Sequence, residues 1–192
     1  MKKLFMAAAL MVGLAGVCPA ELVISEYMAN PAALPDSEGE YFELYNSGAA
    51  AISFDTISDD GSDNFVFTTP ISVAPGEFVV LGNTAQSYVD FVYTPYFLAN
   101  GADEIVVSSG ATELARVNYS NGDPFGAGVA VVLEDVFGSP LNYIAEVSTF
   151  STGDIGSPGV AGSTITAIPE PSAVAVLALF GCGVAVRRSR RA

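Results

Sequence analysis

Residues 40–46 read EYFELYN, and this stretch decides the fold because its side chains alternate in character. Successive side chains of a β-strand point to opposite faces, so Phe42 and Leu44 share one face, and Tyr41, Glu43 and Tyr45 share the other. We expect Phe42 and Leu44 in the core and Glu43 in solvent. The period of two predicts a strand that buries one face.

Seven further runs of β-forming residues, each bounded by Gly, Pro, Asn or Asp, surround this stretch. They are LVISEYM (22–28), NFVFTT (64–69), EFVVLGN (77–83), DEIVVSS (103–109), ELARVNYS (113–120), GVAVVLED (128–135) and NYIAEVST (142–149). No stretch of useful length between them has a helical period. About eight short strands separated by turns predict an all-β fold of the β-sandwich kind.

Some runs also predict where their residues lie. In 113–120, Ala115, Val117 and Tyr119 are expected to face the core and Arg116 the solvent. The run 128–135 is apolar on both faces, so we expect it inside a sheet. SSGATE (108–113) predicts a hairpin tip, and VAPGE (73–77) predicts a Pro-Gly turn.

The charges of the chain are segregated between its ends and its middle. The 192 residues include 21 acidic and 7 basic side chains, with no His and no Trp. Arg116 is the one basic residue between the two ends, where the others lie: Lys2, Lys3, Arg187, Arg188, Arg190 and Arg191. The middle therefore carries an excess of about 20 negative charges, which would repel nucleic acid.

The residue types missing from the middle exclude several kinds of site. Cys18 and Cys182 both lie in apolar end segments, so the stretch between those segments contains no Cys, His or Lys. Nucleophilic Ser-His, Cys-His and Ser-Lys sites and a Schiff-base lysine are therefore excluded. A structural zinc site would lack its usual ligands, and no disulfide can form in this part. We expect no enzyme activity and no catalytic residues.

The N-terminal end, MKKLFMAAALMVGLAGVCPA, has a basic start, an apolar stretch and small residues at its close. This order predicts a secretory signal peptide over residues 1–20, removed by signal peptidase between Ala20 and Glu21. A lipoprotein signal centred on Cys18 is the weaker alternative, because Val17 stands where a small residue is usual.

The C-terminal end is also apolar, over residues 173–186, and is followed by four arginines. As a helix these residues would span about 21 Å, which is short of the roughly 30 Å hydrocarbon core. Flanking arginines can extend the span, and they are expected to stay in the cytoplasm. One interpretation is a plain membrane anchor, joined to the β-domain (21–159) by a linker at 160–168.

The motif before the apolar segment suggests a more specific interpretation. Residues 169–192 resemble a PEP-CTERM sorting signal in the order of their parts, which are Pro169, Glu170, Pro171, the transmembrane segment 173–186 and the basic end 187–192 with Arg187, Arg188, Arg190 and Arg191. Such signals occur on exported bacterial proteins and are read by a membrane protease-transpeptidase, the exosortase. The resemblance implies cleavage near the motif and transfer to the cell envelope, cell surface or extracellular matrix.

The middle of the chain resembles the lamin-tail domain. The resemblance rests on LVISEYMANP, GEYFELYNSG, SDDGSDNFVF, VAPGEFVVLGN, GVAVVLED and DIGSPGV in this order. Its most specific pieces are ISE followed by an Asn-Pro turn, the strand GEYFELYN and the closing SPG. The chain departs from the family in having no Trp, with Tyr41 and Phe42 in the second strand instead. The resemblance implies an immunoglobulin-like β-sandwich that binds or scaffolds and has no shared catalytic residues.

Two groups of acidic residues are candidates for chemistry. Glu40 and Glu43 have the residue type of a glycosidase acid pair, although a solvated strand position explains Glu43 better. DTISDDGSDN supplies oxygen ligands of the kind that calcium prefers, from Asp55, Asp59, Asp60, Asp63 and Asn64. The same residues also favour turns for local reasons. Calcium is therefore a candidate cofactor, and no other cofactor is expected.

Together these features predict an exported, non-enzymatic β-sandwich with a structural or adhesive role. The alternative is a surface module that binds calcium or carbohydrate, with Tyr41, Tyr45 or Tyr88 as exposed aromatic contacts. The expected partners are signal peptidase, the exosortase and extracellular polysaccharide. Contact with the membrane is expected only through the C-terminal tail.

Overall fold

The computed structural model describes residues 21–94, 98–136 and 140–162, and these residues are almost entirely β-structure. The strands are β1 (Leu22–Met28), β2 (Tyr41–Asn46), β3 (Ile52–Ser58), β4 (Asn64–Val73), β5 (Phe78–Gly82), β6 (Phe91–Val92), β7 (Asp103–Ser109), β8 (Thr112–Tyr119), β9 (Val131–Leu133) and β10 (Tyr143–Ala145). One four-residue helix, α1 (Asp36–Gly39), precedes β2. The prediction of an all-β fold is confirmed.

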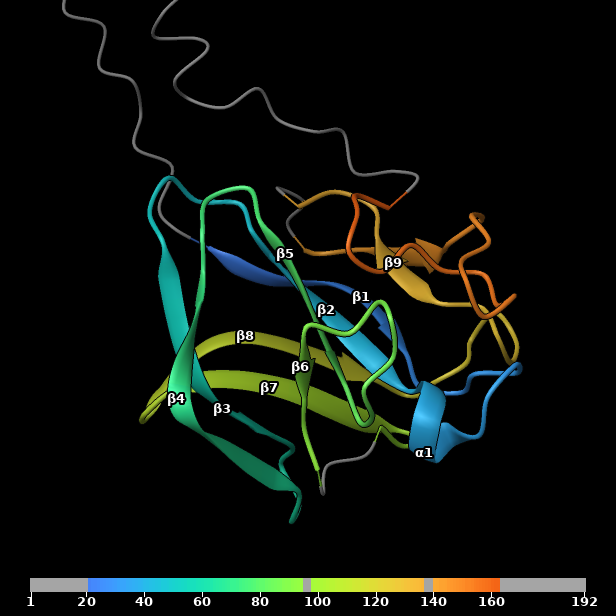
Figure 1. Cartoon of the computed structure of the whole chain (residues 1–192), viewed down its shortest axis with the longest axis horizontal. Coiled ribbons are helices and arrows are strands. Elements are labelled where there is room, and N and C mark those ends of the chain that lie inside the picture. Colours follow the sequence, from blue (N-terminus) through green and yellow to red (C-terminus); the bar gives the residue numbers. More distant parts are fainter. Residues whose placement is uncertain (1–20, 95–97, 137–139, 163–192) are drawn as a thin grey trace, which may run out of the picture.

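The strands form two sheets that pack on each other (Figure 1). The larger sheet has the order β10-β9-β1-β2-β5-β6, and the smaller has the order β4-β3-β7-β8. All neighbours within them are antiparallel except β5 and β6. The run 128–135 contributes β9, which lies between β1 and β10 inside the larger sheet as predicted.

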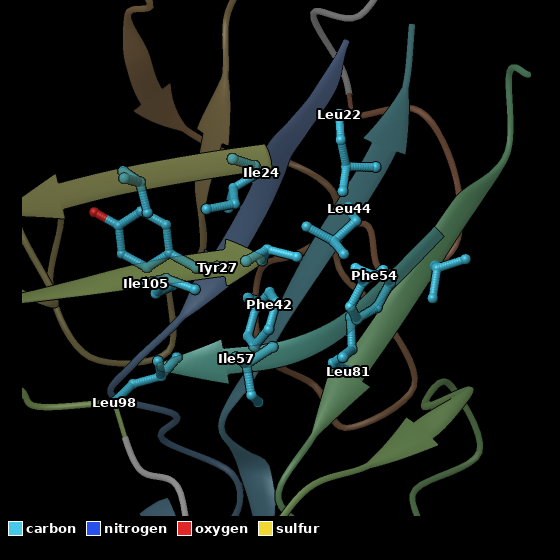
Figure 2. Close-up of a cluster of buried hydrophobic side chains, with 14 of the residues drawn as sticks. Leu22, Ile24, Tyr27, Phe42, Leu44, Phe54, Ile57, Leu81, Leu98 and Ile105 are labelled. Atoms are coloured by element: carbon cyan, nitrogen blue, oxygen red, sulfur yellow. The ribbon is translucent and has the colours of Figure 1, made fainter. Parts of the chain in front are cut away.

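The core lies between the two sheets and is built from the inward faces of both (Figure 2). Phe42 and Leu44 of β2 face it, together with Phe54 and Ile57 of β3 and Ile105 of β7. Ala115, Val117 and Tyr119 of β8 are also buried, as their alternation predicts, and the ring of Tyr119 stacks on that of Tyr27 at 5.0 Å between centroids. Burial of these apolar side chains is the main stabilising contribution to the fold.

A β-bulge in β1 decides which residues of that strand reach the core. The register joins Ile24 to Leu44 and then Glu26 to Glu43, which leaves Ser25 as an extra residue. Without the bulge, Glu26 would share the inward face of Leu22 and Ile24. With it, Tyr27 turns into the core and Glu26 turns to the outer face of the larger sheet, beside Glu43.

Both predicted turns are present. The β7–β8 hairpin closes between Ser109 and Thr112, where Gly110 has a φ of 55°. Pro75 and Gly76 are the central residues of the other turn, in which the Glu77 N–H donates to the Ala74 carbonyl oxygen. Gly76 has a φ of 75°, a value that side chains with a Cβ disfavour.

Two strands, β3 and β6, were not among the eight expected. In β3 a second bulge lies between Phe54 and Thr56. The buried residues Phe54 and Ile57 are therefore three positions apart, so the sequence of β3 does not alternate with a period of two. β6 has only two residues, both exposed. Within the described residues, no helix is long and apolar enough to cross a membrane.

Candidate functional site

Glu43, one half of the proposed acid pair, is not the solvated strand residue that its alternation predicted. Its side chain does point away from Phe42 and Leu44, but only 1% of its surface is exposed. The reason is a cover on the outer face of the larger sheet, formed by residues 146–162, here called the closing segment. Figure 1 shows this segment in orange, beside β9 and β1 and away from β7 and β8.

Two neighbouring glutamates bind the closing segment to this outer face. Glu26 accepts hydrogen bonds from the Tyr41 hydroxyl and from both the N–H and the hydroxyl of Ser157. Glu43 accepts from the Ser25 hydroxyl at 2.6 Å and from the Gly159 N–H at 2.7 Å. The carboxylates therefore act as acceptors for donors that would otherwise be buried without partners.

A third glutamate completes this arrangement from within the closing segment. Glu146 is 2% exposed and accepts hydrogen bonds from the N–H groups of Val147 and Ser148. Its other oxygen lies 3.2 Å from the Ser157 hydroxyl, which Glu26 also contacts. We call this group the carboxylate network; it consists of Ser25, Glu26, Tyr41, Glu43, Glu146, Ser157 and Gly159.

Asp154 binds the closing segment at a second point. Its Oδ1 accepts hydrogen bonds from the N–H groups of Ala32 and Ala33, which follow β1 in the chain. Asp154 is buried as well, at 6% exposure. The N-terminal loop and the closing segment are thus joined by a carboxylate that the sequence pattern did not single out.

Among the residues that the structure describes, no cation offsets the buried carboxylates. Arg116 is the one basic residue in the described part of the chain, and it pairs at the surface with Asp60 at 2.9 Å and Glu113 at 2.8 Å. Burial raises the pKa of Glu26, although its hydrogen bonds from Ser157 and Tyr41 act in the opposite direction. Burial and then the nearby Glu26 raise the pKa of Glu43 well above its usual range. Both side chains therefore favour the protonated form more than an exposed glutamate does.

Parts of the three most specific pieces of the lamin-tail resemblance meet in this network. ISE supplies Ser25 and Glu26, the ELYN half of the second strand supplies Glu43, and SPG supplies Ser157 and Gly159. In addition, Asn46 of ELYN donates to the carbonyl oxygens of Ala50 and Val73 and so fixes the turn after β2. The spacing of these motifs along the chain gave no sign that they lie together.

Glu40, the other half of the proposed acid pair, lies in separate surroundings. It accepts hydrogen bonds from the Leu98 N–H at 3.1 Å and from the Asn83 side chain at 3.3 Å. Burial, followed by the charges of Asp36 and Asp103, raises the pKa of Glu40 to about 8. The hydrogen bonds of Glu40 and Glu43 involve different residues, so each carboxyl has surroundings of its own.

The five calcium candidates lie in and around the β3–β4 turn, and three of them have separate side-chain contacts. Asp55 accepts from the Gly110 N–H, and Asp59 accepts from the N–H groups of Gly61 and Asp63. Asp60 pairs with Arg116, and Asn64 begins β4. Across the described ranges, no three His, Cys, Asp or Glu side chains are grouped so as to hold a metal ion.

We expect calcium to have no specific effect on stability, because Asp55 and Asp59 already accept hydrogen bonds and Asp60 pairs with Arg116. Thermal unfolding in millimolar CaCl₂ should give the same Tm as in equal MgCl₂, since both ions screen the acidic surface alike. A rise with calcium alone that Asp59→Asn removes would instead establish the site.

An open pocket of about 500 Å³, here called the cavity, lies beside the carboxylate network. Its walls come from the start of β5, the segment before β6 and the closing segment, through Phe78, Ser87, Tyr88, Asp90, Phe150, Ser151, Pro158 and Gly159. Of the three tyrosines predicted as exposed contacts, only Tyr88 reaches it. Tyr41 and Tyr45 are buried, because the closing segment and Phe78 cover them.

The remaining predicted residues lie outside the described part. They are the signal peptide 1–20 with Ala20, the transmembrane segment 173–186 and the sorting residues Pro169, Glu170, Pro171, Arg187, Arg188, Arg190 and Arg191. Glu21, predicted as the first mature residue, is described and directly precedes β1.

No model of a known protein family matches the chain, and no curated protein matches it.

Proposed function

We propose that the chain is an exported, non-enzymatic β-sandwich of the immunoglobulin-like, lamin-tail kind, with a structural or adhesive role. One observation carries the proposal: its buried glutamates are occupied as hydrogen-bond acceptors that hold the closing segment on the sheet. Residues with this role stabilise a module and offer no open carboxyl pair for hydrolysis. An extracellular domain without disulfides depends on such internal contacts.

Export and sorting are proposed from the two ends of the chain. Signal peptidase would remove residues 1–20, and the exosortase would act near Pro169, Glu170 and Pro171. The domain would then reside in the cell envelope, at the cell surface or in the extracellular matrix, after a transient membrane anchorage through residues 173–186. The high negative charge of the middle favours solubility in that setting.

We expect the mature protein to lack both ends. Intact-mass spectrometry of the native protein, taken separately from membrane and culture-fluid fractions, should give a mass without residues 1–20 and without the residues after the Pro-Glu-Pro motif. Replacing Pro169, Glu170 and Pro171 with alanines should leave the full C-terminus in the membrane fraction. A wild-type protein with an intact C-terminus, confined to the membrane, would show that the tail is a plain anchor.

A second candidate function is carbohydrate binding, and the cavity beside the network favours it. The cavity combines aromatic side chains with a carboxylate and two serine hydroxyls. Sites for small ligands are concave and hold their ligand through aromatic side chains and a few placed polar groups. This candidate is compatible with an adhesive role at a polysaccharide surface.

A further inference from the structure

The walls of the cavity are fixed by contacts behind them. Tyr88 and Phe150 meet edge to face at 5.1 Å between ring centroids, and the buried ring of Tyr41 contacts both, at 5.5 Å and 5.9 Å. Phe78 stacks on Tyr45 at 4.5 Å. Aromatic rings that are already held in place lose little conformational entropy when a ligand binds against them.

Hydrogen bonds also fix two polar groups that line the cavity. Asp90 is exposed, and its Oδ2 accepts the Val80 N–H at 2.9 Å, which orients the carboxylate. The Gly159 N–H donates to Glu43, so the backbone wall at 158–159 is bound to the carboxylate network. Ser87 and Ser151 add exposed hydroxyls that can both donate and accept.

This combination selects a class of ligand. A sugar ring presents C–H groups that pack on aromatic faces and hydroxyls that donate to a carboxylate. The volume of about 500 Å³ lies within the roughly 300–1,000 Å³ usual for small-ligand sites. None of the lining residues is basic, and Asp90 adds a negative charge, so uronic acids, sulfated sugars and phosphates would be repelled.

We propose that this cavity binds a neutral sugar unit of a polysaccharide, with Tyr88 and Phe150 against the ring and Asp90 accepting from its hydroxyls. The proposal rests on the second candidate function and specifies its ligand class and contacts. It does not depend on export or sorting, which the intact-mass measurement tests separately.

Affinity electrophoresis of the full chain tests the proposal, with dextran, galactomannan and hydroxyethyl cellulose as neutral probes and polygalacturonate as the anionic one. We expect retardation by at least one neutral polysaccharide and none by polygalacturonate. Tyr88→Ala and Asp90→Asn should each weaken the retardation about tenfold or more. Phe125→Ala removes an exposed aromatic outside the cavity and should bind like the wild type.

Asp90→Asn keeps an oxygen acceptor for the Val80 N–H, so it tests the contact without disturbing the fold. Circular dichroism of each variant shows whether a loss of binding reflects unfolding. The proposal is overturned if none of the three neutral polysaccharides retards the wild type, or if folded Tyr88→Ala and Asp90→Asn proteins are retarded as strongly as it is. Retardation by polygalacturonate alone would also overturn it.

Discussion

Replacing Glu26 with alanine should destabilise the protein by about 2–5 kcal/mol, because it leaves two buried donors without an acceptor, each at a cost of about 1–3 kcal/mol. The donors are the Tyr41 hydroxyl and the Ser157 N–H, since the Ser157 hydroxyl can still donate to Glu146. The closing segment should detach first, since Ser157 is one of the points that bind it. Chemical denaturation followed by circular dichroism measures the loss.

Two matched variants separate the hydrogen bonds from the charge. Glu26→Gln keeps one acceptor oxygen and the side-chain volume, so we expect a loss of about 1–2 kcal/mol. Glu38→Ala removes an exposed glutamate from α1 and should change stability by no more than about 0.5 kcal/mol. Equal stability of Glu26→Ala and Glu38→Ala would contradict the role assigned to the network.

Stability should fall as the pH rises from about 5 to about 8. The pKa of Glu40 is about 8, and the pKa values of Glu26 and Glu43 are raised as well. In the unfolded chain these side chains lose their protons near the ordinary glutamate pKa of 4.5, so the folded state holds protons that the unfolded chain has already lost. The folded state therefore binds more protons in this range, and each such proton lowers stability by about 1.4 kcal/mol per pH unit. Thermal unfolding across this range measures the effect as a falling Tm.

Repulsion among the many surface carboxylates would also lower stability as the pH rises, so the measurement needs a control. About 0.5 M salt screens exposed charges but leaves buried groups largely unaffected. The fall in Tm should persist in salt and should become shallower in Glu40→Gln, which keeps an acceptor for the Leu98 N–H. A Tm that stays level or rises between pH 5 and pH 8 in salt would show that these glutamates are ionised in the folded protein.

Alternation predicted the strands well where it was regular. The run 22–28 matches β1 and the run 103–109 matches β7, and Phe42, Leu44 and the inward residues of β8 lie where a period of two places them. Alternation could not predict the two bulges. One extra residue at Ser25 and another in β3 each reverse the inward and outward faces, and no local pattern marks them.

The sequence identified the residue types of the site but not its contacts. Alternation predicts that Glu43 lies in solvent, because a strand of this kind usually exposes its second face. The cover over that face comes from residues more than a hundred positions later, and tertiary contacts at that separation leave no local signal. The motif SPG carries part of the lamin-tail resemblance, yet only folding brings its N–H groups to their acceptors, Glu26 and Glu43.

The position of β1 has a consequence for how the chain reaches its final form. β1 is the first strand to be synthesised, yet it lies between β2 and β9, and Glu26 must wait for Ser157, 131 residues later, before its contacts are complete. Closing so long a loop is entropically costly, and folds dominated by distant pairings form slowly. A chain that is synthesised from its N-terminus can therefore complete the Glu26 contacts only after nearly all of the domain has been made.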